Sequence, residues 1–248
     1  MSIADDTKLA AALAEAAGQI ALAVRASGLV VGRGLGDAGD KAANAFLMPA
    51  LRQHRPDDAI LSEESEDSAE RLSRKRVWIV DPVDGTREFA EGRSDWAVHV
   101  GLSIDGQAQV GAVALPDLGL VLSSDPERAD DAGATGKIVV SRSRAPALAE
   151  EVAQALGLEL VGMGSAGAKA MAVVRREADA YLHSGGQYEW DNCAPVAVAQ
   201  AHGLHCSRID GSPLRYNRAE ALSPDLLICR RELAEPLLDA IANAQTKA

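Results

Sequence analysis

The sequence predicts a layered α/β fold built from two fused halves, and the pattern of its elements indicates this. In the first half, two helical segments precede a run of strands that includes a hairpin turn at Asp105-Gly106, as in an antiparallel sheet. In the second half, strand and helix patterns alternate, as in sheets covered by helices. We expect an N-terminal α+β half over residues 1–134 and a C-terminal α/β half over residues 135–248, separated by the polar stretch at 126–136.

Two helices are expected at the start of the chain. Residues 5–27 place Leu9, Leu13 and Val24 on a helical repeat, with acids before them and a glycine after them. Glycines 32, 34, 36 and 39 predict a mobile loop, after which Asp40 opens a second helix that continues to about Gln53. This loop is not a P-loop, because no G-K-[ST] follows it.

Short apolar runs follow and predict the two sheets. The first sheet is expected from strands at 59–61, 77–80, 96–104, 109–115 and 120–123. The second half is expected to contain strands at 138–140, 158–161 and 180–182, helices at 146–156, 168–176 and 190–201, and a final helix from about residue 231.

Composition and charge favour a soluble, cytoplasmic protein. No basic start precedes an apolar block, and no run approaches the ~18 apolar residues of a membrane span. Three scattered cysteines exclude a disulfide framework, and the five histidines show no zinc-site spacing. The net charge of −11 argues against binding of a nucleic-acid polymer, which prefers a basic surface.

Acidic residues gather at the expected ends of strands and starts of helices. They are Asp40, Glu63-Glu64, the pair Asp81 and Asp84, and Asp191. Any one of them alone is most simply a helix cap or a solvated turn residue. Several acids at element ends instead favour a ligand site, because sheet proteins collect ligands at strand ends.

The spacing of Asp81 and Asp84 suits a pair of metal ions. An extended chain would separate them by about 10 Å, whereas a turn at Pro82 brings their Cα atoms within about 7 Å. Their carboxylates can then converge on two cations about 3.5–4 Å apart. Oxygen-only ligands indicate Mg²⁺, and free amides at Gly85-Thr86 suit a phosphate group. The motif therefore predicts metal-assisted phosphoryl transfer to water.

The motif differs from that of another phosphatase class. Haloacid-dehalogenase-type phosphatases use D-x-D-x-T, in which the first aspartate is phosphorylated. Here the two aspartates are three apart with a proline between them, so the helper acid is not placed for that mechanism.

The motifs resemble those of the lithium-sensitive, magnesium-dependent inositol monophosphatase superfamily. The match rests on W-I-V-D-P-V-D-G-T-R-E-F at 78–89, L-S-E-E-S at 61–65 and E-W-D-N-C-A-P at 189–195, in the family's order. Within the superfamily the chain is most similar to the CysQ-type 3′(2′),5′-bisphosphate nucleotidases, through A-G-D-K-A-A-N at 38–44, V-V-S-R-S-R at 139–144 and G-S-A-G-A-K at 164–169. The resemblance implies a sugar-phosphatase-type αβαβα sandwich.

The resemblance also implies the metal ligands. Glu63, Asp81 and the Val83 carbonyl would hold a first Mg²⁺ ion, which carries the attacking water. Asp81 would bridge to a second ion held by Asp84 and Asp191. A third, looser ion at Glu63 is left open.

Further roles follow from the same resemblance. Asp40 with Thr86 would activate the water, and the amides of Gly85 and Thr86 would bind the scissile phosphate, without a phosphoenzyme. The expected contacts to the rest of the substrate are Ser141, Arg142, Arg144, Ser165, Lys169, Tyr188 and Glu189. His183 stands where relatives often have arginine, so the contacts to a second phosphate are left open.

The activity implied is removal of the 3′-phosphate from 3′-phosphoadenosine 5′-phosphate, giving AMP and phosphate, in sulfur assimilation. An inositol or sugar phosphatase, acting on inositol monophosphate or fructose 1,6-bisphosphate, is the enzymatic alternative. A partner of the transcription machinery is the non-enzymatic alternative, although no residue specifically supports it. The expected partner is a small phosphorylated molecule, with neither a nucleic-acid polymer nor a membrane, and a homodimer is left open.

Overall fold

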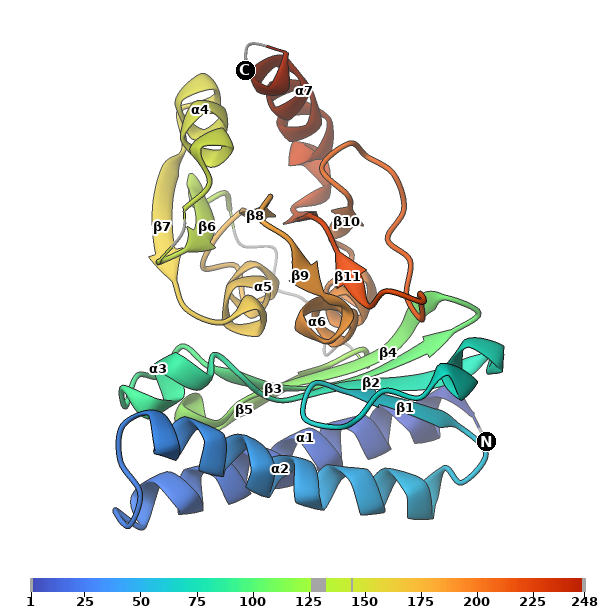
Figure 1. Ribbon diagram of the computed structural model, residues 1–248. Helices are drawn as coiled ribbons and strands as arrows, with labels where there is room; N and C mark the ends of the chain where they lie inside the picture. Colours follow the sequence, from blue (N-terminus) through green and yellow to red (C-terminus); the bar gives the residue numbers. More distant parts are fainter. Residues whose placement is uncertain (1, 126–132, 144, 247–248) are drawn as a thin grey trace.

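The structure, a computed structural model, describes residues 2–125, 133–143 and 145–246. Its elements stack in five layers, helix on sheet on helix on sheet on helix, as Figure 1 shows. The predicted αβαβα sandwich is thereby confirmed. The two five-stranded sheets use residues on either side of the segment 124–136, while the proposed division at residue 134 stays a prediction.

The first layer consists of α1 (Ile3–Ala26) and α2 (Arg33–His54). Ser2 and Asp5 form a capping box at the start of α1, and buried alanines line its inner face. By length and composition α1 alone among the described helices is apolar enough to span a membrane, which is weak evidence for a span. Its alanine face instead packs in the core with residues of α2 and the first sheet.

The expected mobile glycine loop is wrong, because α2 already begins at Arg33. A Cβ at Gly36 would lie 2.6 Å from Thr86 Cγ2, and one at Gly39 would lie 2.6 Å from Phe89 Cε1. These two glycines therefore serve close helix packing rather than mobility. Asp40 therefore stands inside α2, whereas the sequence predicted it at the start of a helix.

The first sheet has the strand order β1-β2-β3-β4-β5. Its strands are β1 (Ala59–Ser62), β2 (Arg76–Asp84), β3 (Ala97–Ile104), β4 (Gln107–Leu115) and β5 (Leu120–Ser123). Only β1 and β2 pair in parallel, so their carboxyl ends share one edge. A register shift lies between Asp81 and Asp84 within the last part of β2, and α3 (Thr86–Ala90) follows the strand.

Both faces of β2 are covered, which explains its uninterrupted apolar run. Trp78 and Val80 pack with residues of α1 and α2, whereas Val77 and Ile79 pack with residues of α5 (Ala166–Val174) and α6 (Glu189–Ala201). Fully burying such a side chain contributes about 1.5–3 kcal/mol. The strand that carries the acidic motif is thus fixed from both sides.

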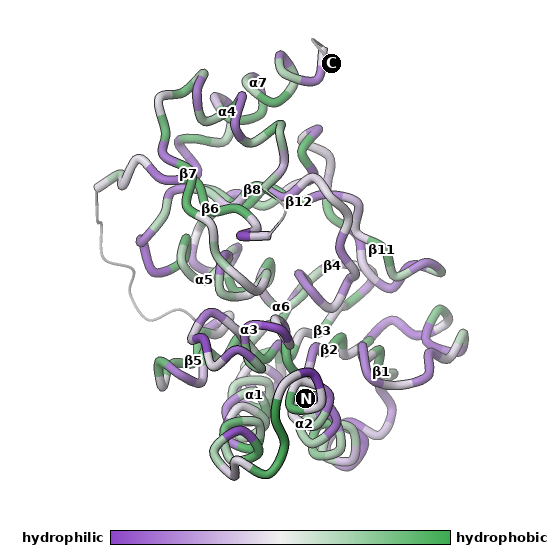
Figure 2. The backbone as a smooth tube through the Cα atoms, turned by 60° about the vertical axis from the view of Figure 1, so that its left-hand side comes forward, coloured by the Kyte–Doolittle hydropathy of each residue, from purple (hydrophilic) through white to green (hydrophobic). Residues whose placement is uncertain are grey.

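The second sheet has the order β10-β12-β8-β6-β7, and β11 pairs separately with β9. Its strands are β6 (Lys137–Ser141), β7 (Glu159–Met163), β8 (Ala180–His183), β10 (His205–Ser207) and β12 (Leu226–Cys229), and the separate pair is β9 (Gln187–Tyr188) and β11 (Leu222–Ser223). The outer helices are α4 (Ala147–Leu156) and α7 (Ala234–Gln245). In Figure 2, β6 and β8 are hydrophobic segments in the interior of this half. Short 3₁₀ turns lie at Ala69–Ser73, Pro116–Leu118 and Arg231–Leu233.

The middle layer, α5 and α6, joins the two halves (Figure 1). A Cβ at Gly111 would lie 2.3 Å from the Ala194 carbonyl oxygen, and one at Gly101 would lie 2.9 Å from the Ala194 amide nitrogen. These glycines let α6 lie directly on β3 and β4. The first turn of α6 is thereby held near the end of β2.

Candidate active site

Two acidic clusters meet at the edge where β1 and β2 end. Oxygen atoms of Asp40, Glu63 and Asp81 lie within 4.8 Å of one another, and so do oxygen atoms of Asp81, Asp84 and Asp191. Asp81 belongs to both clusters. The parallel pairing of β1 with β2 explains the first cluster, because Ser62 is the register partner of Val80 and the next residues are both acids. The structure thus brings all the expected carboxylate ligands together.

Burial, together with the nearness of these acids to one another, raises the pKa of most of them. Burial raises the pKa of Asp40 to about 8, and burial together with Asp191 and Asp84 raises the pKa of Glu63 to about 7. Burial and the neighbouring Asp84 raise the pKa of Asp191 to about 6. Burial and the nearby acids also hold the pKa of Asp81 well above its ordinary value.

The donor set fits divalent metal ions. Asp40 Oδ1 and Asp81 Oδ1 are buried without a hydrogen-bond partner among the described residues. The side chains that make up the two clusters are all carboxylates, the ligand type that hard cations such as Mg²⁺ prefer. A cation between the acids would supply the missing partners and remove their mutual repulsion.

Asp84 differs from the other acids because donors surround it. It accepts hydrogen bonds from Ser165 Oγ at 2.5 Å and from the amides of Gly167 at 2.6 Å and Ala166 at 3.1 Å, at the start of α5. Burial raises its pKa, but His99, Ser165 and the Gly167 amide outweigh burial and lower the pKa to about 2. Asp84 therefore stays ionised beside acids that tend to hold protons.

Thr86 lies between Asp40 and the turn. Its hydroxyl oxygen lies 2.9 Å from Asp40 Oδ2 and 3.1 Å from the Val83 carbonyl oxygen, and it can donate to either. Gly85 precedes it with φ of 88°, a left-handed conformation in which a Cβ would lie 3.1 Å from Ser165 Cβ. The hydroxyl holds one oxygen of Asp40, and the other oxygen remains available.

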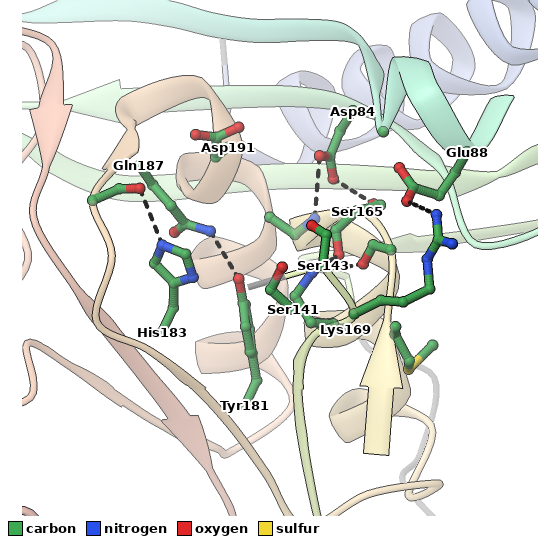
Figure 3. Close-up of a pocket in the computed structure, with 16 residues that line it drawn as sticks. Asp84, Glu88, Ser141, Ser143, Ser165, Lys169, Tyr181, His183, Gln187 and Asp191 are labelled. Atoms are coloured by element: carbon green, nitrogen blue, oxygen red, sulfur yellow. Dashed lines mark hydrogen bonds and ion pairs between the residues drawn. The ribbon is translucent and has the colours of Figure 1, made fainter. Parts of the chain in front are cut away.

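A polar cavity of about 190 Å³ opens beside the second cluster. Figure 3 shows Asp84 and Asp191 at one side, with Ser165, Lys169, Tyr181 and His183 along the wall. The lining comes from both halves of the chain. The cavity suits a small polar ligand whose phosphate lies against the acidic clusters.

The expected substrate contacts from β6 reach this cavity in part. Ser141 and Arg142 line it, whereas Arg144 lies outside the described residues. The Arg142 guanidinium is paired with Glu88 at 2.6 Å and Glu91 at 3.2 Å, both from the α3 region. An anionic ligand would therefore compete with these acids for Arg142.

Lys169 is buried at the cavity wall. Its ammonium donates to the carbonyl oxygens of Gly164, at 2.6 Å, and Ser165. Burial lowers its pKa to about 8. The ammonium also lies 5.2 Å from the ring centroid of Tyr181, within cation–π range.

Two expected contacts need correction. The Glu189 carboxylate is fully buried and accepts hydrogen bonds from the amides of Asn217 at 2.6 Å and Arg218 at 2.8 Å, so it holds a loop and does not line the cavity. Tyr188 also lies outside the lining: it is half exposed and stacks on Trp190 with ring centroids 4.6 Å apart. The preceding residue, Gln187, lines the cavity instead.

Sequence reasoning missed Glu88, Tyr181 and Gln187 as lining residues. The position of Glu88, four residues after Asp84 at the start of a helical turn, was a usable signal. It also missed His99, whose signal was a polar residue within the apolar run of a strand.

Comparison with known proteins identifies curated relatives of similar length. A 3′-phosphoadenosine 5′-phosphate phosphatase from Mycobacterium bovis is 51% identical over 240 residues, covering 92% of this chain and 90% of the relative. The protein of that name from Mycobacterium leprae is 49% identical over 254 residues, covering 95% and 93%. The 3′(2′),5′-bisphosphate nucleotidase CysQ of Escherichia coli K12 is 32% identical over 197 residues, covering 74% and 80%.

Solved structures share the fold. The inositol monophosphatase from Anabaena superposes with a TM-score of 0.79 at 23% identity, covering 98% of this chain and 97% of its own. CysQ from Bacteroides thetaiotaomicron superposes with a TM-score of 0.78 at 23% identity, covering 92% and 97%. The family description "Inositol monophosphatase family" matches residues 4–246. With its acidic clusters, layered fold and near-complete match, the chain belongs to the inositol monophosphatase family.

Proposed function

We propose that this chain is a Mg²⁺-dependent phosphatase that removes the 3′-phosphate of 3′-phosphoadenosine 5′-phosphate, yielding AMP and inorganic phosphate, in sulfur assimilation. The observation that carries the proposal is the pair of acidic clusters sharing Asp81 beside a polar cavity lined by Arg142 and Lys169. Relatives with about half of their residues identical bear the name of this activity, which supports the substrate.

Two metal ions are part of the proposal. Glu63, Asp81 and the Val83 carbonyl would hold one, and Asp81, Asp84 and Asp191 would hold the other. When bound, such ions lower the pKa of water and neutralise charge on a phosphate. The third ion at Glu63 is not needed for this chemistry.

The chain's own groups then complete the reaction. Asp40 is held by Thr86 through one oxygen, and its free oxygen accepts a proton from the attacking water. The amides of Gly85 and Thr86 orient the scissile phosphate. As the water oxygen bonds to phosphorus, the bond to the ribose 3′-oxygen breaks, and that oxygen takes up a proton from solvent water. Asp40 then returns the proton that it accepted to solvent. No enzyme residue is phosphorylated.

Location and partners complete the proposal. The net charge of −11 supports a small-molecule substrate rather than a nucleic-acid polymer. The burial of the alanine face of α1 supports a chain that works without a membrane, and we place it in the cytoplasm.

A second candidate is a phosphatase of inositol monophosphate or of a sugar phosphate such as fructose 1,6-bisphosphate. This candidate is favoured because the two cationic side chains of the cavity already have partners. Arg142 is paired with acids, and Lys169 donates to backbone carbonyls. A substrate with one phosphate would need neither of them.

The deciding experiment measures Mg²⁺-dependent phosphate release from 3′-phosphoadenosine 5′-phosphate, inositol 1-phosphate and fructose 1,6-bisphosphate in parallel. We expect the highest kcat/KM for the nucleotide. A higher value for either polyol phosphate would overturn the substrate and keep the metal chemistry. The variant Asp81→Asn, purified in the same way, controls for contaminating phosphatases, and no release from any substrate would favour the non-enzymatic alternative.

A further inference from the structure

His99 is a fully buried histidine that touches both sides of the second acidic cluster. It lies on β3, where it is the register partner of Asp81. Its Nε2 atom lies 3.2 Å from Asp84 Oδ2, and its Nδ1 atom lies 3.0 Å from the Trp190 carbonyl oxygen. One imidazole ring therefore joins the end of β2 to the first turn of α6.

The two acids of this cluster come from distant parts of the chain. Asp84 ends β2, and Asp191 stands in the first turn of α6, so they approach the cavity from different elements (Figure 3). Asp191 is tied to its own helix, because Oδ2 accepts a hydrogen bond from the Tyr188 amide at 2.6 Å. The separation of the two carboxylates thus depends on how the start of α6 sits against β2.

The hydrogen bonds that Asp84 accepts come from α5 and not from α6. Its remaining hydrogen-bond donors, on Ser165, Ala166 and Gly167, all belong to the start of α5. His99 is the side chain that meets both the Asp84 carboxylate and the backbone of α6.

The His99 ring is fully buried and lies against the start of α5. A Cβ at Gly167 would lie 2.1 Å from His99 Nε2, and one at Gly101, two residues along β3, would lie 3.1 Å from Cys193 Sγ. Because residue 167 is glycine, the start of α5 approaches His99 Nε2 closely, and glycine at 101 lets α6 approach β3 in the same way.

We propose that His99 is a positioning residue for the metal site formed by Asp84 and Asp191. It holds the Asp84 carboxylate and the first turn of α6 at the separation that a shared cation needs. This inference rests on the proposed function in taking these acids as metal ligands. Removing a group that orients a ligand in this way typically lowers metal affinity or activity by about 10- to 100-fold.

The test titrates metal-free protein with Mn²⁺ and follows binding by calorimetry and by the electron paramagnetic resonance of free Mn²⁺. We expect His99→Leu, which keeps side-chain volume but no polar contact, to weaken one of two binding sites by about 10- to 100-fold. His99→Gln, which keeps an amide N–H, is expected to weaken the same site by a smaller factor. In both variants the other site, which shares only Asp81 with it, is expected to lose less affinity.

His202 supplies the matched control at the opposite end of α6. Its Nε2 also meets a backbone carbonyl, that of Ser123, at 3.2 Å, but it lies at the C-terminal cap of the helix. We expect His202→Leu and His202→Gln to leave both Mn²⁺ affinities unchanged. Should His99→Leu fail to fold, by circular dichroism, His99→Gln decides the test.

The possible results distinguish failure of the role proposed for His99 from failure of the proposed metal-dependent function. Two Mn²⁺ sites of wild-type affinity in His99→Gln and in any folded His99→Leu would overturn the inference alone. Equal weakening of both sites, with a lowered Tm, would reduce His99 to a packing residue. Absence of Mn²⁺ binding by the wild-type chain would overturn the proposed metal chemistry and this inference with it.

Discussion

The Thr86 hydroxyl lies 2.9 Å from the Asp40 carboxylate, although 46 residues separate them in the sequence. The contact exists because α2 approaches α3 closely, through glycines that leave no side chain between the two helices. This packing places Asp40, which lies within α2, next to the end of β2.

Loss of this contact should impair turnover. We expect Asp40→Asn and Thr86→Ala to lower kcat by about 10²- to 10⁴-fold, the range for removing a general base, since Asp40 can no longer take the proton from water. The measurement is steady-state phosphate release at saturating Mg²⁺. Asp37→Asn, an exposed carboxylate on the same helix, is the control and should keep wild-type kcat. A near-normal kcat in both test variants would contradict the assignment.

Arg142 should affect the nucleotide substrate more than a polyol phosphate. Its guanidinium lies at the cavity, where a second phosphate can replace Glu88 as its partner. We expect Arg142→Gln to lower kcat/KM for 3′-phosphoadenosine 5′-phosphate at least about 10-fold more than for inositol 1-phosphate, since a charged hydrogen bond is worth roughly 1.5–3 kcal/mol. Arg87→Gln, which removes another partner of Glu91 from an exposed position, is the control. Equal losses with both substrates would argue against a second phosphate at this arginine.

The close contact between α2 and α3 can be tested by measuring the free energy of unfolding. Gly39→Ala places a methyl group 2.6 Å from Phe89 Cε1, so we expect the free energy of unfolding to fall by about 1–3 kcal/mol. Gly34→Ala, on the same helix, meets only Val30 Cγ1 at 3.4 Å and should be neutral or stabilising by up to about 1 kcal/mol. Urea denaturation measures both. Equal effects of the two substitutions would indicate that α2 does not pack on α3 in this way.

The raised pKa values of the acids predict how the stability of the metal-free protein depends on pH. Asp40, Glu63 and Asp191 titrate near pH 8, 7 and 6 in the folded chain but near pH 4 when unfolded. The folded state therefore binds more protons in this window, and stability is lost as pH rises from about 4 to 8. The lowered pKa of Asp84 acts in the opposite sense and only below about pH 4.

Mg²⁺ should reverse the loss of folding stability that occurs as the pH rises. We expect the increase in Tm on adding Mg²⁺ to be larger at pH 8 than at pH 6, because the ion replaces protons that the acids otherwise hold. Thermal unfolding with EDTA or with Mg²⁺ across this range is the measurement. In Asp81→Asn the increase should shrink at every pH, and a wild-type increase that is independent of pH would contradict the shared acidic clusters.

Local patterns predicted the elements and the acids of the site. The apolar run before Asp81 and the acids after β1 are strand ends that sequence alone can place, and parallel pairing then brings them together. The prediction for the glycines of α2 was wrong because several glycines close together in a sequence usually indicate a flexible loop. Gly36 and Gly39 are instead required by close contact with side chains of α3, which are distant in sequence.

Direction within a helix was a second source of error. Glu189 and Asp191 are two residues apart in α6, so their side chains leave the helix in different directions, one toward the loop at Asn217 and the other toward the cavity. The pairing of Arg142 with Glu88 could not be read from sequence either, because the two residues lie in different halves and no periodicity connects them.

Asp81 is the one acid that the two clusters share. A cation in one cluster would draw the charge of Asp81 toward itself and lessen the repulsion that opposes deprotonation in the other. Occupancy of the two sites is thus linked thermodynamically, and the linkage is reciprocal: whatever factor the first ion confers on the second, the second confers on the first. The affinity of each site for a divalent cation should accordingly depend on whether the other site is filled.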